Sequence, residues 1–111
     1  MSRTRYRIFE NEYPYFMTCT IVGWQAIFTR PEAVEIVYDS WRHLQQEKQF
    51  QLYGYVILEN HLHLIAGSPQ TSQGIQRFKS CTARRIIDHL QAVRAERLLE
   101  LLALFKRLHK T

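Results

Sequence analysis

The chain has 111 residues and a formal net charge of +5, and 46% of its residues are hydrophobic and 13% aromatic. This composition can build the core of one compact domain, and it excludes a disordered chain. No long uncharged apolar run is present, and the basic N-terminus lacks the apolar segment of a secretory signal. We therefore expect a single domain over residues 1–111, located in the cytoplasm with no membrane partner, in which Cys19 and Cys81 are free thiols.

The positive charge is concentrated in the C-terminal third of the chain. Residues 1–70 contain six Lys/Arg and seven Asp/Glu, whereas residues 71–111 contain nine and three. Arg3, Arg5 and Arg7 form a second basic region at the N-terminus. Two such regions could bind a polyanion such as nucleic acid, and a solvated helical face rich in lysine and arginine would give the same pattern.

The first half of the chain predicts a strand followed by a helix. Residues 15–22 are rich in aromatic and β-branched side chains and lie between a proline and a glycine, which is typical of a strand. Thr29 and Glu32 then have the spacing of a capping box, and apolar residues recur every three or four positions. We expect an amphipathic helix that ends near Lys48.

The middle of the chain predicts an antiparallel hairpin. Residues 50–58 and 61–66 are both strand-like, and only Glu59 and Asn60 separate them. Asparagine tolerates the positive φ that a tight hairpin turn requires, so we expect the turn at this pair.

The C-terminal part predicts helices. No Pro or Gly interrupts residues 75–111, and the apolar residues from Ile75 to Val93 keep a helical period, so a long helix begins near Thr71 or Ser72. The Leu-rich residues 98–108 continue this pattern, but their apolar stripe is broader than packing against one core requires. We expect a third helix or a bent continuation there.

The order strand, helix, strand, strand, helix predicts an α+β fold. It is most of a ferredoxin-like or RRM-like layout, in which an antiparallel sheet has helices on one face. The last strand of that layout is not visible in the sequence. We therefore expect either a three-stranded sheet or a sheet whose edge is completed by another chain, followed by a Leu-rich helix.

His61 and His63 are the candidate metal ligands. Because successive side chains of a strand point to opposite faces, both imidazoles point to one side, about 6.5 Å apart along the strand, while Leu62 and Leu64 point to the other. Two convergent imidazoles can hold one divalent ion. A polar face on a half-exposed strand also explains the spacing, since two ligands alone do not define a metal site.

The residues around these histidines resemble the signature of the single-tyrosine HUH transposases, in particular the REP-associated tyrosine transposase group. Residues 53–65, YGYVILENHLHLI, match the family's apolar strand, turn ending in Asn, and His-hydrophobic-His in the next strand. The similarity extends over residues 6–93 and includes the first strand, the Gly23-Trp24 loop and the helix at 74–83. Beyond residue 93 it is limited to helical character.

This resemblance implies a metal-dependent endonuclease and strand transferase that acts in DNA transposition and recombination. The substrate is single-stranded DNA, often next to a hairpin. A tyrosine attacks the scissile phosphate and forms a 5′-phosphotyrosine bond, while a divalent ion, Mg or Mn, stabilises the developing charge. The resemblance assigns His61 and His63 as ligands of that ion, DNA as the partner and a homodimer as the assembly.

The chain departs from the family in its tyrosines. In these transposases the nucleophilic tyrosine lies on a helix downstream of the histidine strand, whereas all six tyrosines of this chain precede His61. No catalytic residue can therefore be assigned. The chain resembles a C-terminally truncated member, and we expect it not to form the covalent intermediate alone.

The long helix carries the candidate DNA contacts, which are Arg77, Lys79, Arg84 and Arg85. Their cationic heads could bind phosphates while the apolar residues of the helix face the sheet, and a solvated helix face is the alternative. Trp24, in the loop after the first strand, could stack on an unpaired base or fill a gap in the core.

Three functions are compatible with these patterns. The first is an HUH transposase-like DNA-binding protein, and the second is a non-catalytic RRM-like module that binds nucleic acid without cutting it. The third is a structural protein that dimerises through residues 98–108. An edge strand without its last neighbour and the apolar stripe both favour a homodimer. The stripe consists of Leu98, Leu101, Leu102, Phe105 and Leu108.

Overall fold

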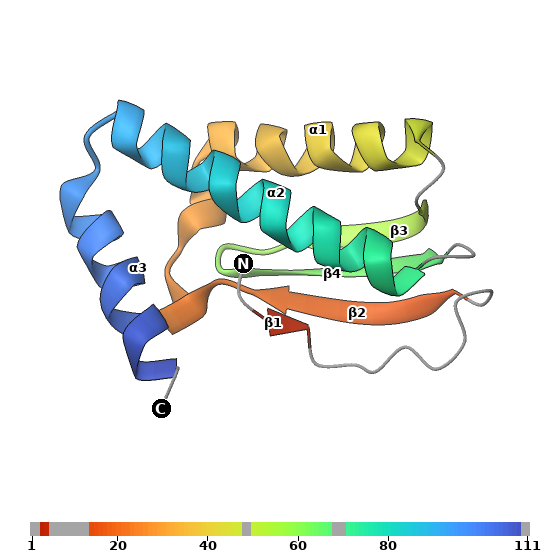
Figure 1. The fold of residues 1–111 in the computed structure, drawn as a ribbon, viewed down its shortest axis with the longest axis horizontal. Helices are drawn as coiled ribbons and strands as arrows, with labels where there is room; N and C mark the ends of the chain where they lie inside the picture. The colour runs from red at the N-terminus through yellow and green to blue at the C-terminus, as the bar shows by residue number, and fades with distance from the viewer. Residues whose placement is uncertain (1–2, 5–13, 48–49, 68–70, 110–111) are drawn as a thin grey trace.

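The computed structural model describes residues 3–4, 14–47, 50–67 and 71–109. This part of the chain forms an α+β structure with an antiparallel sheet and three α-helices, which confirms the predicted class (Figure 1). The elements are β1 (Arg3–Thr4), β2 (Tyr15–Thr20), the 3-10 turns η1 (Val22–Trp24) and η2 (Ile27–Thr29), α1 (Pro31–Gln46), β3 (Gln51–Ile57), β4 (His61–Gly67), α2 (Thr71–Ala92) and α3 (Glu96–His109).

The sheet has the strand order β1-β2-β4-β3, and each neighbouring pair is antiparallel. β2, β3 and β4 are the three strands that the sequence predicts. The sequence left open whether another chain completes the edge of the sheet. At the outer edge of β2 the chain's own N-terminal residues pair with one end of the strand, since Arg3 lies opposite Thr20. A strand of two residues carries no periodic pattern, so the sequence could not reveal it.

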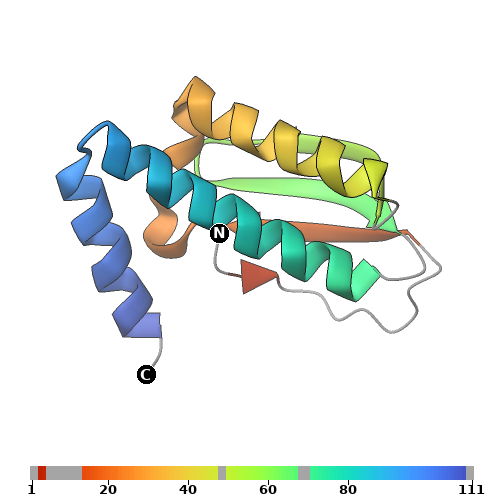
Figure 2. The same ribbon diagram turned by 45° about the horizontal axis from the view of Figure 1, so that its top comes forward.

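Helices α1 and α2 pack side by side on one face of the sheet (Figures 1 and 2). The rings of Trp41 in α1 and Phe78 in α2 stack between them, with centroids 5.5 Å apart. The strands contribute every second residue to this core, in agreement with a sheet that is covered on one side. The buried hydrophobic side chains of the strands are Met17, Cys19, Leu62, Leu64 and Ala66.

The predicted capping box does not form. Arg30 is the N-cap of α1 and makes no side-chain capping bond. The Thr29 hydroxyl instead donates to the carbonyl of Ala26 at 2.7 Å, within the preceding turn η2. The prediction was wrong because the short turn η2 lies directly before α1, and the threonine closes that turn instead of capping the helix.

The predicted hairpin of β3 and β4 is present, but its turn differs from the expected one. The Leu58 N–H donates to the His61 carbonyl at 2.8 Å, and neither Glu59 nor Asn60 has a positive φ. The turn is held from outside, since the Phe28 N–H donates to the Glu59 carbonyl and the Ile21 N–H to the Asn60 carbonyl, both at 2.9 Å. These bonds fix the hairpin turn to the loop that follows β2.

The Leu-rich segment forms a separate helix, α3, which packs against α2 and η1. A left-handed residue, Arg94 with φ 56°, separates α2 from α3. Two residues of the predicted apolar stripe, Leu98 and Leu102, pack on the core, and so does the neighbouring Leu99. Among the described residues of α3, the exposed large apolar side chains are Leu104 and Leu108.

No helix in the described ranges is both long enough and apolar enough to span a lipid bilayer.

Replacing Gly23 with alanine should lower the free energy of unfolding by about 1–3 kcal/mol. Gly23 has φ +69°, and a Cβ there would clash with the ring of Phe105, so the substitution strains the backbone and displaces α3. Urea unfolding followed by circular dichroism measures the effect. Gly54→Ala is the matched control, because a Cβ at Gly54 meets nothing within 4 Å, and an equal loss in both variants would contradict this packing.

Candidate functional site

His61 and His63 lie side by side on the sheet face opposite to α1 and α2. Their ring centroids are 4.8 Å apart and their planes are inclined by 81°. Leu62 and Leu64, which alternate with them, are 0% and 1% exposed and belong to the core. The structure therefore has the alternation that the sequence predicts, with two half-exposed imidazoles on the open face of the sheet.

Each histidine has its Nδ1 in a hydrogen bond. The Nδ1 of His61 lies 2.7 Å from Oδ1 of Asn60, and the Nδ1 of His63 lies 2.9 Å from Oγ1 of Thr18. An amide oxygen only accepts, so the His61 Nδ1–H donates and the lone pair is on Nε2. The threonine hydroxyl can accept from His63 in the same way, and neither Nε2 has a hydrogen-bond partner among the described residues.

Two features of the fold place these partners. Thr18 lies directly opposite His63 in the register of β2 and β4, so its side chain is on the same face and within reach. Asn60 belongs to the hairpin turn that the loop after β2 holds, and its Nδ2 donates to the Trp24 carbonyl at 3.5 Å. Because the amide nitrogen of Asn60 donates to this carbonyl, its amide oxygen is the atom that faces His61.

This donor set fits two ligands of a divalent ion. Metal-bound histidines commonly donate the other ring N–H to a neighbouring oxygen, which fixes the tautomer and the ring orientation. Within the described ranges no group of three or more His, Cys, Asp or Glu side chains could complete a metal site. The protein itself would thus provide two imidazole nitrogens, and oxygen atoms of water or of a bound phosphate would provide the remaining ligands.

Aromatic rings flank the histidine pair on both sides. Trp24 meets His61 edge-on with centroids 6.2 Å apart, and Phe16 stacks on His63 at 5.3 Å. Trp24 is 59% exposed, which excludes the core-filling alternative for this residue. Phe16 was not among the residues selected from the sequence, although it alternates with the buried Met17 and therefore shares the open face with Thr18.

The predicted DNA-binding residues of α2 lie on the helical side of the sheet, not beside the histidines. Arg77 pairs with Glu47 at 3.1 Å and Arg85 with Asp39 at 3.5 Å, both across to α1 or its C-cap. Arg84 pairs with Asp88 on its own helix at 3.6 Å and is 80% exposed. Lys79 is half-buried, and this burial lowers the pKa of its ammonium group.

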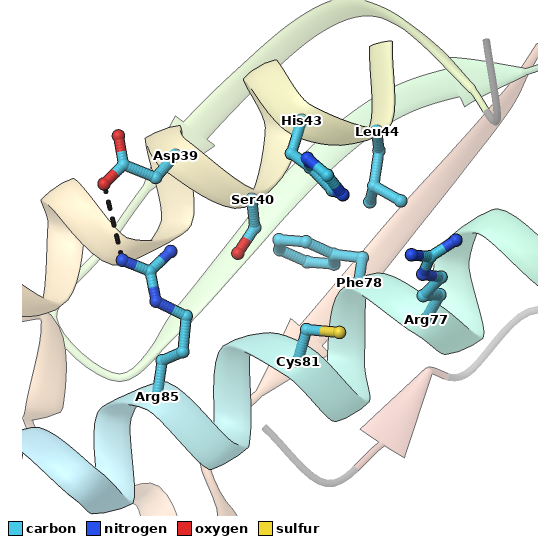
Figure 3. Close-up of a pocket in the computed structure, with 8 residues that line it drawn as sticks. All are labelled: Asp39, Ser40, His43, Leu44, Arg77, Phe78, Cys81 and Arg85. Atoms are coloured by element: carbon cyan, nitrogen blue, oxygen red, sulfur yellow. Dashed lines mark hydrogen bonds and ion pairs between the residues drawn. The ribbon is translucent and has the colours of Figure 1, made fainter. Parts of the chain in front are cut away.

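A shallow hollow of about 200 Å³ lies between α1 and α2 (Figure 3). Its floor is apolar, and its basic groups face carboxylates, as the Arg85–Asp39 pair in Figure 3 shows. His43 at its rim lies 3.1 Å from Glu47, which also binds Arg77. The charges around the hollow are thus balanced within the protein. The lining residues are Asp39, Ser40, His43, Leu44, Arg77, Phe78, Cys81 and Arg85.

Comparisons of this chain with protein-family models, with curated proteins and with solved structures found no match.

Proposed function

We propose that this chain is an HUH transposase-like protein that binds single-stranded or hairpin DNA through a divalent ion, Mg or Mn, held by His61 and His63. The observation that carries the proposal is the pair of same-face imidazoles, each with Nδ1 bonded to a neighbouring oxygen. When bound, the ion supplies Lewis-acid polarisation of a phosphate oxygen. The imidazoles hold the ion, while Thr18 and Asn60 orient the imidazoles.

The arrangement of the elements supports a ferredoxin-like fold for the proposal. The segment from β2 to α2 has the order βαββα, and β2 and β4 occupy the centre of the sheet. In the complete ferredoxin-like layout a final strand pairs beside the first one. Here β1, from the opposite end of the chain, pairs at that edge of β2.

The proposed role of this chain is to bind the DNA phosphate, not to form a phosphotyrosine. The six tyrosines all precede His61 in the sequence. Tyr55 is the last tyrosine before His61 in the sequence. Its ring packs against Trp41 and Tyr38 on the helical side of the sheet. We therefore assign no nucleophile within these 111 residues. A tyrosine adduct formed by this chain alone would contradict that assignment.

Titration calorimetry with Mn²⁺ tests the proposal directly. We expect weak binding with one ion per chain, and His61→Ala or His63→Ala should lower the affinity at least 10-fold because two protein ligands become one. His43→Ala is the matched control, since that histidine pairs with Glu47 on the helical side. Equal Mn²⁺ affinity in the His61/His63 double variant would exclude the metal assignment.

A non-catalytic RRM-like module is the second candidate. The exposed rings of Phe16 and Trp24 on the open face favour it, because RRM sheets bind bases by stacking them on aromatic side chains of that face. The two candidates differ in their metal dependence. If EDTA leaves DNA binding unchanged and Mn²⁺ does not bind, the RRM-like function replaces the HUH-like one.

We also propose a homodimer. The exposed apolar side chains near the end of α2 and on α3 would then contact the second copy. These are Ile87, Val93, Leu104 and Leu108.

A further inference from the structure

Four rings form a continuous row across the open face of the sheet, in the order Trp24, His61, His63 and Phe16. The successive centroid distances are 6.2, 4.8 and 5.3 Å. Trp24 and Phe16, at the two ends of the row, are 59% and 50% exposed. The two central rings are the candidate metal ligands. A ligand that lies along this row would meet a flat apolar surface, then a phosphate-binding centre, then a second flat surface.

The backbone holds Trp24 in this exposed position at some cost. Its φ is 56°, a left-handed conformation that bulky residues adopt rarely and that costs about 1–3 kcal/mol. Three bonds hold the loop: the Trp24 N–H donates to the Ile21 carbonyl at 3.0 Å, Asn60 Nδ2 donates to the Trp24 carbonyl, and Gln25 Nε2 donates to the Gly23 carbonyl. These bonds fix the backbone of the loop, and the indole that it carries lies exposed beside His61.

The strands of this face carry no charge that would repel an anionic ligand. Strands β2, β3 and β4 contain no Asp, Glu, Lys or Arg, and the chain as a whole has a net charge of +5. A phosphate placed at His61 and His63 would therefore meet no carboxylate from these strands. Flat apolar rings on both sides of a phosphate site match unpaired nucleotides, whose bases stack on aromatic side chains and whose phosphates bind cations.

We propose that Trp24 and Phe16 are two stacking positions for unpaired nucleobases, one on each side of the histidine pair. A single strand then crosses the sheet along the ring row with one phosphate at His61 and His63. This inference rests on the proposed function and adds the two residues and the mode of binding, in which bases of the unpaired strand stack on the two rings. Stacking tolerates every base, so the two positions contribute affinity with little sequence preference.

Fluorescence anisotropy with two labelled oligonucleotides of equal length tests the proposal: a ten-nucleotide thymidylate strand, and an abasic strand with the same phosphates. We expect the wild-type chain to bind the thymidylate strand more tightly. Trp24→Ala and Phe16→Ala should each weaken thymidylate binding by about 5- to 100-fold and leave abasic binding unchanged. The loss should appear both in Mn²⁺ and in EDTA at low salt, because stacking does not require the metal.

Tyr55→Ala is the matched control, since it removes a ring that is 51% exposed but lies on the helical side of the sheet. Circular dichroism establishes that each variant folds. Tryptophan emission gives a second readout: Trp41 is 2% exposed, so quenching by the thymidylate strand reports on Trp24 and should disappear in Trp24→Ala.

Two results would overturn the inference, and they are distinguishable. If wild-type protein binds both strands equally, or if Trp24→Ala and Phe16→Ala bind thymidylate as tightly as wild type, the stacking positions are excluded while metal-assisted phosphate binding stands. If neither strand binds and Mn²⁺ titration shows no binding, the proposed function fails together with the inference.

Discussion

Asn60→Ala should weaken Mn²⁺ binding by about 10- to 100-fold, and Thr18→Val should have an effect of similar size. Both substitutions remove the oxygen that holds a histidine Nδ1, at 2.7 Å for His61 and 2.9 Å for His63. Without that bond the imidazole can rotate and can place its proton on Nε2, which removes the lone pair from the nitrogen that would bind the ion. Calorimetric titration with Mn²⁺ measures the loss.

The control for Thr18→Val is Thr20→Val. Thr20 is two residues along the same strand, on the same sheet face, and opposite His61, but its hydroxyl makes no bond to either imidazole. Equal affinities in the two valine variants would contradict a positioning role for Thr18. The control for Asn60→Ala is Asn60→Asp, which keeps an acceptor at the Nδ1 of His61 and should preserve Mn²⁺ binding. If Asn60 only holds the Trp24 carbonyl, the aspartate variant should lose as much Mn²⁺ affinity as the alanine variant.

The sequence predicted the elements that have a strong local period. The hairpin of β3 and β4, the helix α1 and the long helix α2 follow from apolar spacing, and strand alternation places His61 and His63 on one face. These features depend on neighbours within a few residues. Local spacing is therefore sufficient information for them.

The surroundings of the histidines depend on contacts between distant segments and could not be predicted in this way. Thr18 and His63 are 45 residues apart, and only the register of β2 against β4 brings them together. The position of Trp24 depends on a left-handed backbone and on a bond from Asn60, neither of which leaves a sequence pattern. Alternation with the buried Met17 would have placed Phe16 on the open face, but not against His63.

The basic residues of α2 lie on the helical side of the sheet, away from the histidine pair, and this position leads to a prediction about salt. DNA binding should fall with added salt, by about 0.7 log units in affinity per tenfold increase in salt for each phosphate contacted on a single strand. If α2 provides a second contact surface, replacing Arg84 and Arg85 with glutamine should reduce the salt slope by about 1.4. Anisotropy titrations between low and moderate salt measure this slope for each variant.

Arg42→Gln combined with Arg30→Gln is the control, because it removes the same charge from α1 and its N-cap. Arg84 gives the clearest test within α2. Its ion pair with Asp88 is 3.6 Å long and highly exposed, and exposed pairs contribute little free energy, so a phosphate can compete for this guanidinium. Arg85 must instead leave Asp39, a bond that crosses to α1. A slope that falls equally in the α1 and α2 variants would show that net charge alone attracts the DNA, and a slope that changes in neither would restrict the contact to the histidine face.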